Sequence, residues 1–249
     1  MLFYVEYFNI CFDINLLDFN IEFKATHDVY CWFRTIFKAM TPAFSTQQVT
    51  VASNATVKRV FDIVFALLVT LLLLSWLVPL IAALIKLDSR GPIFFKQLRT
   101  GKNGVPFYCF KFRSMYINSD ADHKQASRND SRITKIGAFM RKTSIDELPQ
   151  FINVLRGEMS VVGPRPHMLQ HTEVYSSTIH NFMVRHAVSP GITGLAQVTG
   201  HRGETKETEA MIKRVNADIH YLQNWSFSLD MKIVWITVYQ AVKGSENAF

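Results

Sequence analysis

The sequence predicts a mainly helical α+β protein, in which a small domain follows a kinked apolar helix that is long enough to enter a membrane. Three observations predict this fold class. Residues 63–85 contain no charged side chain, residues 92–115 alternate as a β-hairpin does, and helical periodicity returns towards the C-terminus. A chain of 249 residues can hold one core with an appended segment. We therefore expect an accessory segment at residues 1–55, the membrane helix at 56–88 and one domain at 89–249.

The first 55 residues are rich in aromatic side chains and end in the polar run STQQVTVASNAT. They predict a small accessory segment followed by a linker. No basic region opens the chain and acidic residues come early, so a cleaved signal peptide is not expected. The three cysteines, Cys11, Cys31 and Cys109, are widely spaced and indicate neither a disulfide framework nor a zinc cluster. A reducing compartment fits this usage best.

The membrane helix is the clearest physical signal in the sequence. The run IVFALLVTLLLLSWLVPLIAALI begins at Ile63 and ends at Ile85, and about 20 apolar residues suffice to cross a bilayer core. Pro79 has no N–H to donate to the carbonyl of Ser75, so we expect the helix to bend there. The Ser75 hydroxyl can help to satisfy the backbone groups that the bend leaves without partners.

Two topologies are open from these residues alone. Lysine and arginine flank the run on both sides, and positive charge favours the cytoplasmic face at each end. A bent helix that enters and leaves by the cytoplasmic face satisfies both flanks. The alternative is an ordinary kinked transmembrane helix, because proline is common in such helices.

The chain beyond Leu87 is typical of a soluble catalytic domain with short helices and strands. PIFFKQLRTGKNGVPFYCFKFRSM, residues 92–115, alternates apolar and basic residues around a Gly-Lys-Asn-Gly turn, as in a hairpin. A later helix has a periodic apolar face and polar residues on its other faces. The apolar positions are Met211, Val215, Ile219 and Leu222, and the polar ones are Lys213, Arg214 and Asp218.

The block RKTSIDELPQFINVLRGEMSVVGPRP, residues 141–166, contains the candidate site. One interpretation is structural: Ser144 as the N-cap and Glu147 three residues later form a capping box. Pro149 complicates it, because a proline there removes an early helical hydrogen bond, so the helix either begins nearer Glu147 or is distorted. Adjacent helical residues point about 100° apart, so Asp146 and Glu147 need separate roles.

The other interpretation is chemical. A carboxylate near a helix start stays ionised and can attack a phosphoryl group, which suits Asp146. Glu147 can hold the Mg²⁺ that neutralises a diphosphate. The cations expected to bind phosphate are Lys111, Arg113, Arg132 and Arg165, with Lys135 nearby. His167 and His171 have the i, i+4 spacing of a zinc pair but no third ligand, so we assign no metal there.

A net charge of +7 and a pI near 9.3 indicate a negatively charged partner, which can be nucleic acid, anionic lipid or a phosphorylated substrate. Charge alone does not choose among these partners. Any one of the cations is more typical of a solvated surface. Their occurrence together beside a membrane anchor favours a phosphorylated substrate.

Several long motifs resemble those of a known family, the bacterial sugar transferases, which are monotopic polyprenyl-phosphate phosphoglycosyl transferases. The similarity runs from Lys58 to about Lys243. It includes KRVFDIVFALL, GPIFFKQLRTGKNG, KFRSM, TSIDELPQFINVLRGEMSVVGPRP and SPGITGLAQVTG. The segment HRGETKETEAMIKRV resembles the branch that contains undecaprenyl-phosphate glucose phosphotransferases of the colanic-acid type.

The resemblance implies an activity. Asp146 would attack the sugar-bearing phosphate of a UDP-sugar and expel UMP, with Glu147 serving Mg²⁺. A polyprenyl phosphate would then take the phosphosugar, which starts an exopolysaccharide or another surface glycan. The resemblance also implies a re-entrant helix, a place at the inner membrane with the catalytic domain on the cytoplasmic face, and no nucleic-acid partner. HRGET favours glucose or galactose as the sugar.

Two departures from the family pattern concern the membrane part. The membrane break in the family is typically a Ser-Pro pair, whereas Trp-Leu-Val separates Ser75 from Pro79 here. Related long enzymes carry several transmembrane helices and a further domain, for which residues 1–55 are too short.

Two other functions compete with the transferase. A non-catalytic, membrane-tethered binder of anionic lipid or nucleic acid explains the charge and the anchor but leaves the Asp-Glu block without a role. A metal-dependent hydrolase of lipid diphosphates would use water and form no covalent intermediate.

Overall fold

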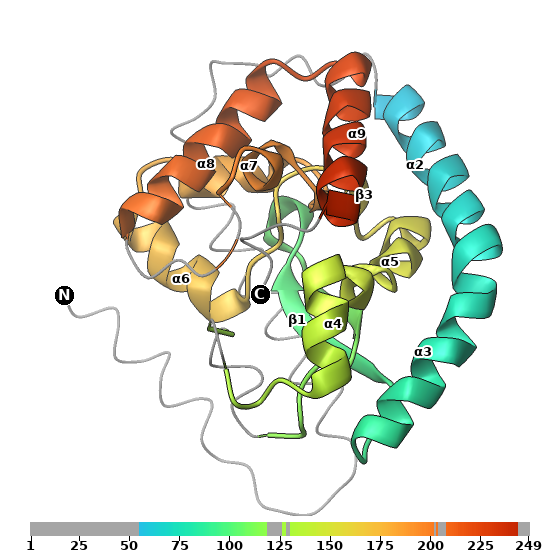
Figure 1. Cartoon of the computed structure of the whole chain (residues 1–249). Helices are drawn as coiled ribbons and strands as arrows, with labels where there is room; N and C mark the ends of the chain where they lie inside the picture. Colours follow the sequence, from blue (N-terminus) through green and yellow to red (C-terminus); the bar gives the residue numbers. More distant parts are fainter. Residues whose placement is uncertain (1–54, 119–125, 128–129, 202, 204–207, 244–249) are drawn as a thin grey trace, which may run out of the picture.

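The computed structural model describes residues 55–118, 126–127, 130–201, 203 and 208–243, and shows helices around two small two-stranded sheets (Figure 1). Within these residues, the prediction of a mainly helical α+β fold is confirmed. The accessory segment expected at residues 1–55, with Cys11 and Cys31, lies outside the described residues except for Ala55.

The elements follow one another along the chain in a fixed order, with 3₁₀ and π-helical turns marked η. They are α2 (Ala55–Val69), η2 (Thr70–Leu74), α3 (Ser75–Asp88), β1 (Phe94–Thr100), η3 (Lys102–Gly104), β2 (Pro106–Phe112), α4 (Lys135–Thr143), η4 (Ile145–Glu147), α5 (Gln150–Arg156), β3 (Ser160–Val162), α6 (Leu169–Thr178), η5 (Phe182–Ala187), β4 (Gly191–Thr193), α7 (Leu195–Val198), α8 (Thr208–Gln223) and α9 (Phe227–Lys243).

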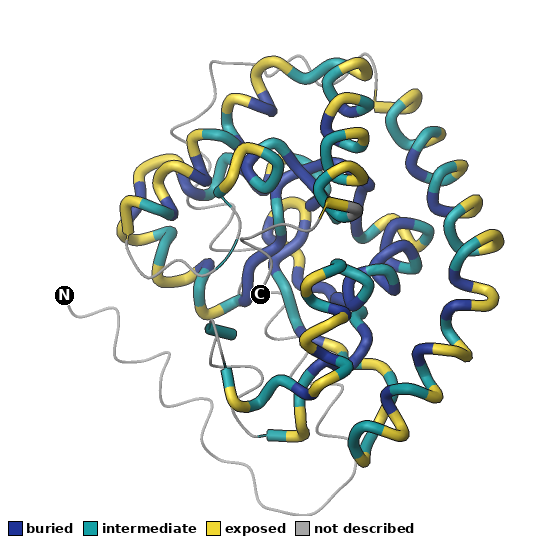
Figure 2. Tube along the Cα trace, viewed as in Figure 1, coloured by how far each residue is buried: buried dark blue, intermediate teal, exposed yellow. Residues whose placement is uncertain are grey.

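The segments α2, η2 and α3 form one continuous helix of 34 residues that arches around one side of the domain (Figure 1). Its most apolar 18-residue window has a mean hydropathy of 2.7, so the helix is long and apolar enough to cross a membrane. Its inner face packs on the domain and its outer face is exposed (Figure 2). The exposed apolar side chains of that outer face are Val57, Val60, Val64, Leu67, Leu68, Leu71, Leu72, Trp76, Leu80 and Leu87.

A π-helical turn lies just before the serine at which we expected the bend to begin. The backbone N–H of Ser75 bonds the carbonyl of Thr70, five residues earlier, and π-turns are a known cause of helix bending. The Ser75 hydroxyl donates to the carbonyl oxygen of Leu71 at 2.7 Å, so it does bond a backbone group. The helix then continues through Pro79 without an interruption in its helical structure.

The beginning of this long helix is fixed to the domain. The ammonium of Lys58 pairs with the carboxylate of Asp230 in α9 at 2.6 Å. Arg59 donates to two carbonyl oxygens in the last turn of α5, at 2.7 and 3.1 Å. These positive charges, read from the sequence as flanks of the membrane helix, are therefore also contacts with the domain.

The end of the long helix is fixed in the same way. Asp88 accepts a hydrogen bond from the backbone N–H of Ile136, in the first turn of α4, at 3.0 Å. Arg113 donates to the carbonyl oxygens of Ser89 and Arg90, which follow α3 directly, at 2.8 and 2.5 Å. Both ends of the long helix thus contact the same domain.

Asp230 is fully buried, and its carboxylate joins three donors. Besides Lys58, it accepts from the hydroxyl of Tyr221 at 2.8 Å and from the indole N–H of Trp225 at 3.1 Å. We expect Asp230→Ala to lower the free energy of unfolding by about 3 kcal/mol, because buried donors and a cation lose their partner. Denaturant unfolding in detergent measures this change. Lys232→Ala, at an exposed position of α9, is the control; equal stability of the two variants would contradict the expectation.

The hairpin predicted at residues 92–115 is confirmed. Strands β1 and β2 pair antiparallel with Phe94 opposite Phe112, and η3 in the Gly-Lys-Asn-Gly segment connects them. Asn103 supplies a left-handed backbone conformation (φ 55°) that closes the turn. Lys111 lies next to the last residue of β2, so the hairpin places this cation at its open end.

The helix predicted from C-terminal periodicity is α8, whose Met211, Val215 and Leu222 are buried as expected. Of the three polar positions expected on its other faces, Lys213 is exposed as predicted and the other two are not. Arg214 and Asp218 are also buried, because α8 packs against α7 on one side and η5 on another.

Candidate active site

A sharp turn of the chain presents the Asp-Glu pair. Helix α4 ends at Thr143, Ser144 adopts the left-handed conformation (φ 59°), and the 3₁₀ turn η4 follows. Ser144 makes no side-chain capping bond to that turn, so the capping-box interpretation of Glu147 is wrong. The distortion expected of Pro149 is confirmed, since a 3₁₀ turn precedes this residue and regular helix α5 begins only after it.

Glu147 is held by two cations from distant parts of the chain. Lys111 of β2 lies 2.7 Å from its Oε1. Arg165, in the Pro-Arg-Pro turn after β3, reaches Oε1 at 2.5 Å and Oε2 at 3.1 Å, in the two-pronged geometry that arginine forms with carboxylates. The charge of Glu147 raises the pKa of Arg165 above its ordinary value. The hairpin, the Asp-Glu turn and the Pro-Arg-Pro turn therefore meet at one point.

Asp146 has a different environment from its neighbour. Its side chain is buried, with 5% of the residue exposed, and no donor in the described part of the chain forms a hydrogen bond with its carboxylate. Burial raises the pKa of Asp146, and the positive charges of Lys111, Arg141 and Arg165 oppose that rise. The carboxylate is therefore poorly solvated, close to cations and available to a ligand.

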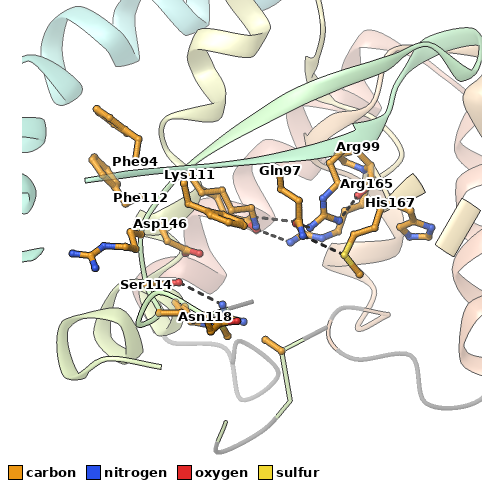
Figure 3. A pocket seen from close by; sticks show the side chains of 18 of the residues that line it. Phe94, Gln97, Arg99, Lys111, Phe112, Ser114, Asn118, Asp146, Arg165 and His167 are labelled. Carbon is orange, nitrogen blue, oxygen red and sulfur yellow. Dashed lines mark hydrogen bonds and ion pairs between the residues drawn. The ribbon is translucent and has the colours of Figure 1, made fainter. Parts of the chain in front are cut away.

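These residues line a cavity of about 360 Å³, which lies in the size range of small-molecule sites. Figure 3 shows Asp146 and Lys111 in its middle part. Aromatic rings of the hairpin stand at one end, and Arg99, Arg165 and His167 stand at the other (Figure 3). The cavity thus holds a buried carboxylate and cations between an aromatic end and a basic end.

The sequence model of the bacterial sugar transferase family matches residues 53–244. The chain belongs to this family. The resemblance stated from the motifs is thereby confirmed.

Three relatives of this sugar transferase are each named UDP-glucose:undecaprenyl-phosphate glucose-1-phosphate transferase. Those of Escherichia coli (strain K12) and Klebsiella pneumoniae are 52% and 50% identical over 188 residues, which is 75% of this chain and 40% of each relative. That of Caulobacter vibrioides is 49% identical over 194 residues, 77% of this chain and 72% of the relative. The chain thus matches less than half the length of the first two relatives.

Two of the four cations expected to bind phosphate meet the Asp-Glu pair in this sugar transferase, and two do not. Lys111 and Arg165 bind Glu147, as described above. Arg113 lines the cavity, but its guanidinium is bonded to the carbonyls that follow α3. Arg132 is not among the lining residues; it pairs with Asp130 at 2.7 Å and lowers the pKa of that carboxyl. Lys135 does not line the cavity either.

A buried arginine that the sequence did not single out supports the Pro-Arg-Pro turn. Arg185 of η5 donates to the carbonyl oxygen of Arg165 at 2.9 Å and pairs with Asp218 of α8 at 2.6 Å. It also lies 2.8 Å from Nδ1 of His167, and burial together with the charge of Arg185 lowers the pKa of His167 well below its ordinary value. His167, considered above as half of a zinc pair, is therefore a neutral partner of this arginine.

Further basic residues line the cavity beside the predicted ones: Arg99, Arg141, His171 and Arg214. One sequence signal could have found Arg99, because the pairing of the predicted hairpin places it on the same face as Lys111. Arg214 gave no such signal, since its burial depends on the packing of α8 against two other elements.

The carboxylates of the cavity fit a magnesium ion that also binds a phosphate ligand. Asp146 and Glu147 are the acidic residues of its lining, and the described residues contain no group of three or more histidines, cysteines or carboxylates around one point. Mg²⁺ is commonly held by one or two carboxylates together with substrate phosphates and water. Glu147 can serve in this way if it exchanges a contact with Lys111 or Arg165.

Proposed function

We propose that this protein transfers a sugar-1-phosphate from a UDP-sugar to a polyprenyl phosphate, undecaprenyl phosphate in bacteria, and releases UMP. The product would start an exopolysaccharide or another surface glycan. One observation carries the proposal: the buried carboxylate of Asp146 has no hydrogen-bond donor within the described residues, beside cations from two other segments. The names of the relatives support undecaprenyl phosphate as acceptor and glucose as the first sugar to test.

In the first step, a carboxylate oxygen of Asp146 attacks the phosphorus that bears the sugar. The bond from this phosphorus to the bridging oxygen breaks, and UMP leaves with that oxygen and its electron pair. The enzyme then carries the phosphosugar as an acyl phosphate on Asp146. Lys111 and Arg165 lie where they can balance the negative charge of the diphosphate.

In the second step, an oxygen of the polyprenyl phosphate attacks the same phosphorus. The bond between phosphorus and Asp146 breaks, which restores the carboxylate and gives a polyprenyl diphosphate sugar. Burial of Asp146 protects the acyl phosphate from water until the lipid phosphate arrives. Glu147 and the substrate phosphates would hold Mg²⁺, which when bound supplies charge neutralisation at the diphosphate.

Glu147→Gln is expected to lower turnover by about 10²-fold or more, because it weakens both the cation pair and the magnesium site. The deficit should shrink as the Mg²⁺ concentration rises, which a magnesium titration of turnover measures. Glu173→Gln, at an exposed position of α6, is the matched control and should behave as the wild type. A deficit that is the same at every Mg²⁺ concentration would assign Glu147 to the cations alone.

The proposed function is tested by assaying UMP release from a panel of UDP-sugars with Mg²⁺ and undecaprenyl phosphate. A membrane-tethered binder releases no UMP. A hydrolase of lipid diphosphates consumes water and gives no covalent adduct, so a trapped phosphosugar on the protein separates it from the transferase. We place the protein at the inner membrane with its catalytic domain on the cytoplasmic face, where nucleotide-sugars are made.

A further inference from the structure

The apolar end of the cavity is continuous with the membrane helix. Phe112 belongs to the same buried cluster as Ile81 and Ile85 of α3. Phe94 stacks on Phe112, with ring centroids 5.5 Å apart and an interplanar angle of 18°. Figure 3 shows these two rings together on one side of Asp146. A path of apolar contacts therefore leads from the helix to the nucleophile.

Exposed apolar side chains also line the cavity and face solvent. Phe94, Tyr116 and Ile117 line it and are 37%, 48% and 71% exposed. Ile117 also lies against the loop that follows α3, because a Cβ on Gly91 would come within 2.6 Å of its side chain. Exposed apolar side chains that gather around a cavity are typical of a ligand-binding groove.

We propose that Phe94, Tyr116 and Ile117 form an acceptor track, the surface on which the first isoprene units of the polyprenyl phosphate lie. This inference rests on the proposed function and adds the place of the lipid. An isoprenoid chain offers apolar contacts along its length, which match Phe94, Ile117 and the ring of Tyr116. It also stays in the bilayer, so its phosphate must reach Asp146 from the side of the membrane helix.

The UDP-sugar then occupies the opposite end of the cavity. A UDP-sugar brings a charged diphosphate and many hydroxyls, which suit the basic end with Arg165 and Arg214. The rival occupant of the aromatic end is the uracil ring, because bases stack on aromatic side chains. Kinetics with the two substrates varied separately distinguishes these occupants.

The test uses Phe94→Ser and Ile117→Ser in the full chain, with the Michaelis constants for undecaprenyl phosphate and UDP-glucose measured separately. Each variant is expected to raise KM for undecaprenyl phosphate about tenfold, the loss that one removed apolar contact of this size gives. KM for UDP-glucose and the rate of adduct formation without acceptor should change less than about twofold.

Phe139→Ser and Val174→Ser are the matched controls, because both side chains are exposed and neither lines the cavity. They should leave KM for undecaprenyl phosphate within about twofold of the wild type. An equal rise in Phe139→Ser would mean general membrane affinity and would overturn the acceptor track. So would an unchanged KM for the lipid in the track variants, or a matching rise in KM for UDP-glucose, which would assign the aromatic end to uracil.

Crosslinking keeps this test separate from the proposed function. A polyprenyl phosphate with a photoreactive group in its first isoprene unit is irradiated with the wild-type protein, and the labelled peptides are sequenced. Label at Phe94, Tyr116 or Ile117 supports the acceptor track even if no sugar is transferred. Label confined to other segments overturns it, while absence of adduct and UMP from the wild type overturns only the transferase activity.

Discussion

Asp146→Asn is expected to lower turnover by at least about 10⁴-fold and to abolish the covalent phosphosugar adduct. The amide keeps the shape of the side chain but cannot act as the attacking oxygen. Nearby groups do not replace it, because both oxygens of Glu147, the other acidic residue of the cavity lining, bind Lys111 and Arg165. UMP release and intact-protein mass after incubation with UDP-glucose measure the two effects.

The folding of this variant supplies the control. Burial raises the pKa of Asp146, so its charge is not a source of stability, and the asparagine protein should unfold at the same temperature as the wild type or higher. The wild-type adduct should be cleaved by hydroxylamine, as an acyl phosphate is. Turnover within tenfold of the wild type, or an adduct on another residue, would contradict nucleophilic attack by Asp146.

Local patterns were sufficient for the parts of this fold whose interactions lie close together in the sequence. The hairpin could be predicted because alternation and the Gly-Lys-Asn-Gly turn lie within one short segment. Once its two strands pair, Lys111 lies at the open end of the hairpin, and no long-range contact is needed to place it there. The apolar run gave the long helix in the same way, and Pro149 gave the delayed start of α5.

The partners within the site depend on long-range contacts, which the sequence does not display. Glu147 fits a capping box by spacing, yet cations 36 positions before and 18 positions after it take its carboxylate. Arg113 and Arg132 belong to basic motifs that the sequence assigned to phosphate binding. In the structure, Arg113 instead donates to a backbone carbonyl oxygen and Arg132 pairs with Asp130. Arg185 and Asp218 become a support for Arg165 only after η5 and α8 have packed.

Other long-range contacts bear on the membrane topology that the sequence left open. Lys58 lies against the buried Asp230, and Arg59 against carbonyls of α5. If the N-terminal end of the long helix lay on the opposite side of the membrane from the domain, Asp230 would remain buried without Lys58. An unpaired buried charge costs several kcal/mol. At the other end, α3 passes into the domain through Asp88 and its bond to α4. These contacts favour a helix with both ends on the side of the domain.

We therefore expect residues just before Lys58 and just after Lys86 to face the cytoplasm, with the outer apolar face of the arch in the bilayer. The variants Asn54→Cys, Arg90→Cys and Glu173→Cys, each made after replacing Cys11, Cys31 and Cys109, report the two ends and the domain. In intact cells a membrane-impermeant thiol reagent should label none of them, and in opened cells it should label all three. The positive flanks and the backbone bonds kept within the helix both favour this result. Labelling of position 54 in intact cells, with positions 90 and 173 protected, would establish a true span and show that the Lys58–Asp230 pair does not form in the membrane.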